Sequence, residues 1–286
     1  MMGVSAAMVS TAGLKEMAQR YPERVFDTGI AEQHAVTLAA GMAMAGNKPV
    51  VAIYSSFLQR AFDQIVSDVA LHDLDVLFLL DRAGVTGPDG PSHHGVFDLA
   101  YLRMIPNMVV GAPADATELC AMIETAVDHE GPMAIRYPKG GAVSVPSIPV
   151  EPLTVGDAEL ISVGEDVLLV AIGRMVEVAQ KAAVDLAEKG VHAGVVNARW
   201  VKPLDPRIAE WAAPVSHIVT LEDGVVTGGF GSGVMELLSS VGLAKAVTTI
   251  GVPDRFLPFG SPSDIMTSVG MDPDSVVSRV LALLGR

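Results

Sequence analysis

The segment 29–35, Gly-Ile-Ala-Glu-Gln-His-Ala, contains the two residues best suited to chemistry, the Glu32 carboxyl and the His34 imidazole. It follows a β-like run, 25–28, and leads into the Ala-, Gly- and Met-rich stretch 35–46, whose small side chains suit close helix packing. A carboxyl group in a pocket of low dielectric constant can both donate and accept a proton. The ordinary alternative is that Glu32 only stabilises the dipole at a helix start.

Two more polar segments follow strand-like runs. Segment 54–64 begins with Tyr54 and Phe57, and segment 81–95 is interrupted by glycines. In an α/β sheet, polar loops at the carboxyl ends of strands assemble an active site. Asp89-Gly90 alone is an ordinary turn signal. Because this turn runs on into His93, we interpret segment 81–95 as a substrate loop.

Other kinds of site are less well supported. His93 and His94 are neighbours that point apart in a loop, and no other His or Cys stands at ligand spacing, so no metal site is predicted. The sequence has no Gly-x-Ser-x-Gly, and the single Cys120 lies on an expected helix. The glycine-rich run 228–233 could hold an anion at a helix start, but close helix packing explains it at least as well.

Composition excludes several classes of protein. The 286 residues are 50% hydrophobic, which indicates a globular chain, and the net charge of −14 argues against nucleic acid. The apolar runs are strand-sized, which argues against a membrane span, and no secretory signal is visible. A single cysteine fits the reducing cytoplasm.

The hydrophobic pattern predicts an α/β fold with two doubly wound domains, mostly parallel sheets flanked by helices. The first domain is expected at 1–140, a Pro-, Val- and Ser-rich linker at 141–157 and the second domain at 158–286. The predicted strands are 49–53, 75–80, 108–111, 133–137, 166–173, 192–197, 217–221 and 247–250. The predicted helices are 6–20, 32–45, 59–71, 115–129, 175–189, 205–212, 229–240 and 274–284.

Four motifs in order resemble the 1-deoxy-D-xylulose-5-phosphate synthase family of the transketolase superfamily. They are 29–35, Tyr54-x-x-Phe57-x-Gln-Arg60, Asp81-Arg82-Ala-Gly with Asp89-Gly-x-x-His93, and Arg136-Tyr-Pro. The resemblance runs from about residue 6 to the C-terminus. It implies a pyrimidine-binding domain followed by a transketolase C-terminal domain.

The resemblance also implies roles for the motif residues, with thiamine diphosphate as cofactor. Glu32 would hydrogen-bond N1′ of the aminopyrimidine and promote proton loss from the thiazolium carbon. Catalytic roles are implied for Glu32, Asp89 and His93; cofactor contacts for Glu32, Tyr54, Phe57 and Arg60; and substrate contacts for Tyr54, Arg82, His93 and Arg136. Arg82 and Arg136 would clamp the acceptor phosphate, since a guanidinium can bind phosphate in a bidentate way.

The implied reaction joins pyruvate to D-glyceraldehyde 3-phosphate with loss of CO₂, giving 1-deoxy-D-xylulose 5-phosphate for isoprenoid, thiamine and pyridoxal synthesis. The family is homodimeric. It binds diphosphate and Mg²⁺ on an N-terminal domain carrying Gly-Asp-Gly, which does not occur in this sequence. We therefore expect the chain to represent the C-terminal half and to be inactive without that domain or subunit. The alternative is a β-type subunit or interaction module of a 2-oxo acid dehydrogenase or split transketolase.

Overall fold

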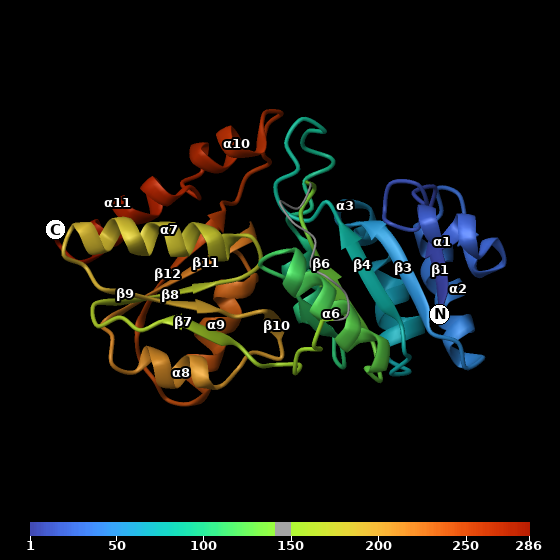
Figure 1. Ribbon diagram of the computed structural model, residues 1–286, viewed down its shortest axis with the longest axis horizontal. Coiled ribbons are helices and arrows are strands. Elements are labelled where there is room, and N and C mark those ends of the chain that lie inside the picture. The colour runs from blue at the N-terminus through green and yellow to red at the C-terminus, as the bar shows by residue number, and fades with distance from the viewer. Residues whose placement is uncertain (141–149) are drawn as a thin grey trace.

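The computed structural model describes residues 1–140 and 150–286, which form two α/β domains side by side (Figure 1). Each domain has its own sheet with helices against it, so the predicted fold class is confirmed. Most of the expected linker, 141–149, lies outside the described residues. Its last part returns to the first domain, where the Leu153 carbonyl accepts a hydrogen bond from Thr125 Oγ1 at 2.9 Å.

The first sheet has seven strands in the order β10-β5-β6-β4-β3-β1-β2. Strand β3, between β4 and β1, is buried along its whole length, as expected of a Val- and Ile-rich run covered on both faces. All pairs are parallel except β10 with β5. The bounds are β1 Met2–Ser5, β2 Val25–Asp27, β3 Pro49–Tyr54, β4 Leu77–Asp81, β5 Val109–Gly111, β6 Met133–Arg136 and β10 Trp200–Lys202.

Strand β10 comes from the second segment of the chain and completes the sheet of the first domain. Trp200 is fully buried there, and a Cβ on Gly111 would lie only 3.0 Å from its ring. This strand is not among the predicted ones, because three residues are too few to show a period. The structural first domain therefore includes residues from beyond the expected linker.

The helices of the first domain agree with the sequence at α2 and α6 and differ elsewhere. The predicted helix 6–20 forms only at its end, because Gly13 has a φ of 87° that interrupts it. The predicted helix 59–71 is a succession of 3₁₀, α and π turns. The bounds are α1 Lys15–Arg20, η1 Pro22–Arg24, α2 Glu32–Met44, α3 Ser55–Leu58, η2 Gln59–Ala61, α4 Phe62–Gln64, η3 Ile65–Ala70, α5 Asp98–Arg103 and α6 Ala116–Asp128.

The second sheet has five strands in the order β12-β11-β8-β9-β7, with only β7 antiparallel to its neighbour. The sequence did not predict β7 or α10. The strands are β7 Glu159–Ser162, β8 Val167–Ala171, β9 Ala193–Asn197, β11 His217–Val225 and β12 Ala246–Val252. The helices are α7 Met175–Glu188, α8 Arg207–Ala212, α9 Phe230–Ser240, α10 Pro262–Ser268 and α11 Pro273–Leu283.

The carboxyl edge of the second sheet faces the first domain. At the end of β9, Asn197 Nδ2 donates to Glu118 Oε1 at 2.9 Å, and just past it Arg199 pairs with the same carboxylate at 2.6 Å. At the far end of β11, Asp223 contacts the loop after β4. Among the described residues, no helix is both long and apolar enough to cross a bilayer.

Candidate functional site

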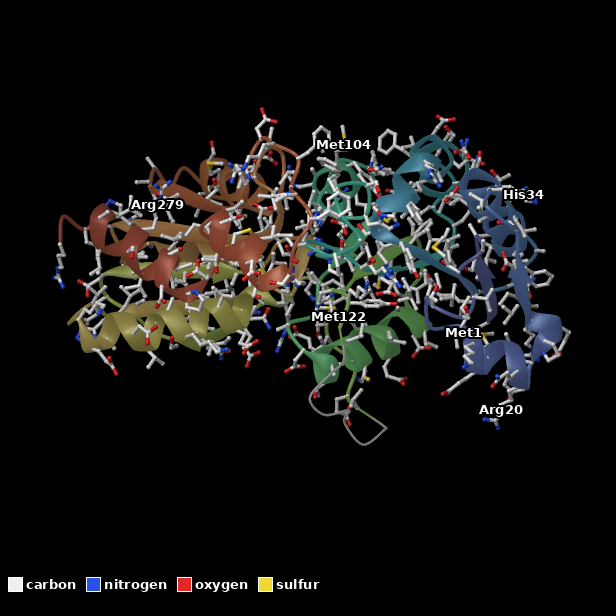
Figure 2. The ribbon with its side chains drawn as sticks, turned by 90° about the horizontal axis from the view of Figure 1, so that it is seen from above. Met1, Arg20, His34, Met104, Met122 and Arg279 are labelled. Carbon is white, nitrogen blue, oxygen red and sulfur yellow. The ribbon has the colours of Figure 1, made fainter. Side chains whose placement is uncertain are left out.

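Glu32 is the first residue of α2 and is only 3% exposed. Its Oε1 lies 2.6 Å from Arg60 Nη1, so a half-exposed cation covers a buried carboxylate. His34, two residues later, is exposed, and Figure 2 shows it at the outer side of the first domain. The structure therefore separates the two groups that the sequence places together, because neighbouring positions of a helix face different ways.

An aromatic cluster borders this ion pair on the side of Arg60. Phe57 stacks against Tyr54 with ring centroids 5.7 Å apart, and the His93 ring meets Phe57 edge-on at 5.2 Å. The Arg60 guanidinium lies 4.9 Å from the Phe57 centroid. Because β3 ends at Tyr54 and α3 starts at once, both rings are fixed at the carboxyl edge of the first sheet.

Two cations converge on Asp89 in the loop after β4. Arg82 Nη1 and Lys139 Nζ lie 3.1 and 2.6 Å from Asp89 Oδ2. The hydrogen bond from Lys139 lowers the pKa of the Asp89 carboxyl below its ordinary value. The Arg82 guanidinium also covers the Tyr54 ring at 4.0 Å. An anionic group would meet two positive side chains here.

Lys139 is not among the residues that the sequence predicted for the site. The sequence does carry a signal for it, because Lys139 directly follows the Arg136-Tyr-Pro motif, just past the end of β6. The carboxyl ends of parallel strands share one edge, so a cation there lies near the loop that follows β4. The sequence-based prediction of a phosphate clamp includes arginines only.

Arg136 does not lie in an open crevice, as its expected contact with the acceptor phosphate would require. It is 4% exposed, and its Nε and Nη2 donate to the two oxygens of Asp98 at 3.0 and 3.1 Å. Nη2 also donates to the backbone carbonyls of Gly95 and Asp223. A buried cation needs such partners, so Arg136 joins the domains rather than facing a ligand.

The other predicted site residues form one continuous series of contacts. Glu32 contacts Arg60, Arg60 covers Phe57, Phe57 touches Tyr54 and His93, and Tyr54 leads to Arg82 and Asp89. A planar, nitrogen-bearing aminopyrimidine fits between the Glu32 carboxylate and the Phe57 ring, since the planar Arg60 guanidinium already makes both contacts. Arg60 must then move aside. In the described part of the chain, no group of three His, Cys, Asp or Glu side chains could hold a metal.

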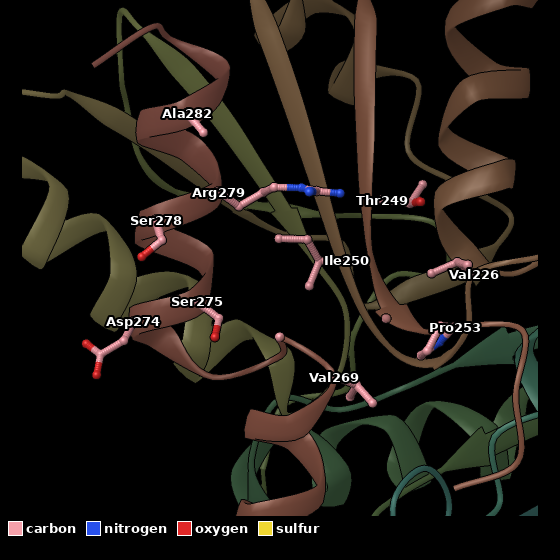
Figure 3. Close-up of a pocket in the computed structure, with 12 residues that line it drawn as sticks. Val226, Thr249, Ile250, Pro253, Val269, Asp274, Ser275, Ser278, Arg279 and Ala282 are labelled. Carbon is pink, nitrogen blue, oxygen red and sulfur yellow. The ribbon is translucent and has the colours of Figure 1, made fainter.

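A separate pocket of about 660 Å³ lies in the second domain, between the edge strand β12 and α11. In Figure 3 the Arg279 side chain extends from α11 toward Thr249. Figure 2 places Arg279 at the opposite end of the molecule from His34. None of the residues that line this pocket belongs to the series of contacts around Glu32.

Family models match both domains. The model described as "Transketolase, pyrimidine binding domain" matches residues 1–142, and "Transketolase, C-terminal domain" matches residues 156–276. The solved chain described as a split gene transketolase, an inactive β4 tetramer, is 32% identical with a TM-score of 0.85. The alignment covers 98% of this chain and 91% of that one. Transketolase of Campylobacter jejuni, 20% identical with a TM-score of 0.78, shows the same fold over 98% of this chain and 43% of its own.

The curated relatives bear the name of the family that the motifs resemble. The 1-deoxy-D-xylulose-5-phosphate synthase of Desulforudis audaxviator is 50% identical over 279 residues, covering 96% of this chain and 44% of the relative. The synthase of Thermomicrobium roseum is 50% identical over 285 residues, covering 98% and 45%. The chain thus spans about half the length of these relatives. From the two matched domains, the motif residues and the fold, the chain belongs to the transketolase family and is similar to one half of its 1-deoxy-D-xylulose-5-phosphate synthases.

Proposed function

We propose that this chain supplies the pyrimidine-binding half of a thiamine diphosphate-dependent transferase that condenses pyruvate with D-glyceraldehyde 3-phosphate to 1-deoxy-D-xylulose 5-phosphate and CO₂. The observation that carries the proposal is the buried Glu32 carboxylate, linked through Arg60 to the Phe57 ring, with the cation-lined loop after β4 beyond that ring. Curated relatives with this synthase name support the choice of substrates.

Glu32 would hold a proton at N1′ of the aminopyrimidine, and Phe57 would offer its face to the ring. Proton transfer requires a carboxyl oxygen within hydrogen-bond reach of the nitrogen, and Glu32 at the start of α2 would supply it. When bound, thiamine diphosphate supplies the electron sink that the loss of CO₂ requires. Arg60 would leave Glu32 when the ring arrives and stay near the site entrance.

Asp89, His93, Arg82 and Lys139 would serve the substrates. His93 borders Phe57, so it lies where it can orient pyruvate or move a proton. Arg82 and Lys139 would bind the acceptor phosphate, for which charge-assisted hydrogen bonds are the strongest available contacts. Asp89 holds both cations in place before a phosphate competes for them. Arg136 takes no part in this binding.

The diphosphate of the cofactor and its Mg²⁺ would be held by a diphosphate-binding domain or subunit, and the working form would be a homodimer of such assemblies. The similar chain described as a split gene transketolase supports a separate subunit, because this chain covers 91% of it. The 286-residue chain by itself would then fold without catalysing the reaction.

The test is an assay of the purified chain with pyruvate, D-glyceraldehyde 3-phosphate, thiamine diphosphate and Mg²⁺, alone and mixed with the diphosphate-binding domain of a relative. We expect product only in the mixture and none with Glu32→Gln. Product from the chain alone would contradict the need for a second domain. Decarboxylation by the mixture without carbon–carbon bond formation would favour the 2-oxo acid dehydrogenase alternative.

A further inference from the structure

The loop after β4, residues 82–95, carries Arg82, Asp89 and His93, and we call it the reactive loop. Its own backbone bonds are few: Gly84 and Gly95 exchange hydrogen bonds at its base, and two turns follow at Gly90 and His93. A loop of this length needs further contacts to hold three side chains in place. The first domain supplies some of them, through Lys139 and the Tyr137 carbonyl, and the second domain supplies others.

The first contact is made by Asp223, at the end of β11, which is 1% exposed. Its Oδ1 accepts a hydrogen bond from the Val85 amide at 3.0 Å. Its Oδ2 lies 2.5 Å from Arg174 Nη2, an ion pair whose angles fall outside hydrogen-bond geometry. The same Nη2 donates to the Val85 carbonyl at 3.1 Å. Both backbone groups of Val85 are therefore bound by the second domain.

The second contact is made by His94, which is 4% exposed. Its Nδ1 lies 3.1 Å from the Thr86 amide, and its Nε2 lies 3.1 Å from the Pro258 carbonyl. An amide can only donate and a carbonyl can only accept, so Nδ1 is the acceptor and Nε2 carries the hydrogen. The neutral ring thus links the reactive loop to the second domain, while its neighbour His93 faces Phe57.

Two glycines allow this close approach. A Cβ on Gly84 would lie 1.7 Å from Asp223 Oδ2, and a Cβ on Gly90 would lie 2.0 Å from the Phe259 ring. A side chain at Gly84 would collide with the buried Asp223 carboxylate, and one at Gly90 would displace the Phe259 ring. The loop is therefore shaped to receive these residues.

We infer that the second domain positions the reactive loop, with Arg174, Asp223 and the Pro258 carbonyl as the positioning groups for Arg82, Asp89 and His93. These contacts between the domains do not depend on a ligand. Only the interpretation of the loop as a substrate-binding site rests on the proposed function. Loss of Arg174 would free the Val85 carbonyl and leave the Asp223 carboxylate buried without its cation. The far end of the loop would remain tied through His94.

The experiment compares Arg174→Met with Arg199→Met by amide hydrogen exchange along the 286-residue chain. The two arginines are matched, because their side chains are 21% and 20% exposed and each pairs with a buried carboxylate. Each also reaches the first domain, Arg174 at the Val85 carbonyl of the reactive loop and Arg199 at Glu118, outside that loop. We expect exchange over 83–95 to become about tenfold faster or more in Arg174→Met, the effect of losing one charge-assisted bond. In Arg199→Met the loop should exchange as in the parent.

Arg174→Lys keeps a cation near Asp223 and should restore part of the protection, which a general loss of packing would not allow. It also serves if Arg174→Met fails to fold. Equal acceleration of the loop in the Arg174 and Arg199 variants, or unchanged loop exchange in a folded Arg174→Met, would overturn the inference. Since exchange needs no cofactor or substrate, the result is independent of whether the synthase activity is found.

Discussion

The two domains have the same architecture but use the carboxyl edges of their sheets differently. In the first domain, the segments that follow β3, β4 and β6 carry side chains in contact with solvent, among them Phe57, Arg82 and Lys139. In the second domain, β9 ends at Asn197 and β11 carries Asp223 near its end, and these residues are 3% and 1% exposed and contact the first domain. The edge that usually binds ligands in open α/β sheets is thus used to hold the neighbouring domain.

The second edge also has a strongly perturbed carboxyl group. Glu222 is fully buried beside Asp223, and burial raises its pKa to about 7 even though the Gly231 and Phe230 amides donate to it. A perturbed carboxyl in an α/β sheet often marks an active site. Here its partners are the amides at the start of α9, so its role is to fix that helix. A shifted carboxyl pKa alone therefore does not distinguish a sheet edge that carries an active site from one that holds a neighbouring helix or domain.

Glu32→Gln should give the largest effect, at the first edge. In the assembled enzyme the amide keeps the shape but cannot carry the proton, so deuterium exchange at the thiazolium carbon should slow by roughly 10²–10⁴-fold. Glu23→Gln, at an exposed position, is the control. An unchanged exchange rate would remove Glu32 from the proposed chemistry.

Arg136→Ala should act on stability. Removing one partner of a buried ion pair leaves Asp98 uncompensated, at a cost of about 3–5 kcal/mol in the free energy of unfolding measured with urea. Arg103→Ala is the control, because Arg103 also bridges the domains but pairs with the exposed Glu236. A small loss of stability together with a raised KM for glyceraldehyde 3-phosphate would indicate instead that Arg136 binds the acceptor phosphate.

Lys139→Ala should weaken binding of the phosphorylated acceptor. One lost charge-assisted contact is worth about 1.5–3 kcal/mol, so the KM for glyceraldehyde 3-phosphate should rise roughly 10- to 150-fold. The KM for pyruvate should change much less. Lys181→Ala, at an exposed helix position, should change neither constant. If both KM values rise equally, Lys139 shapes the loop through Asp89 instead of binding phosphate.

Glu222→Gln should change how stability depends on pH. The folded pKa of about 7 is above the ordinary 4.5, so between these values the folded chain binds more protons than the unfolded chain. This contribution is therefore complete below pH 4.5 and is lost as the pH rises through 7, at up to about 1.4 kcal/mol per pH unit. The variant lacks this group and should lose less stability than the parent over that range. Parallel curves for the two proteins would contradict the assignment.

Much of the fold and of the candidate site could be predicted from the sequence, because these features depend on the local pattern of residues. The buried strands read as runs of Val, Ile and Leu, and the motif residues around Glu32 and Phe57 follow strand ends directly. The features that the sequence did not predict depend on partners that are far away along the chain. Strand β10 is too short to show a period, and the burial of Arg136 follows from Asp98 and from a carbonyl in the other domain. Lys139 was missed because a lysine after a strand resembles any surface lysine.

Strand β10 has a consequence for how the chain can be divided. If the chain were cut in the linker and the halves made separately, β5 would lose its outer neighbour and become an open sheet edge. Its unpaired backbone groups, with the surface that Trp200 now covers beside Met122, would be free to pair with other molecules. Cutting the chain at the boundary that composition suggests would therefore not give two soluble halves. Each half would tend to self-associate unless β10 could pair with β5 again.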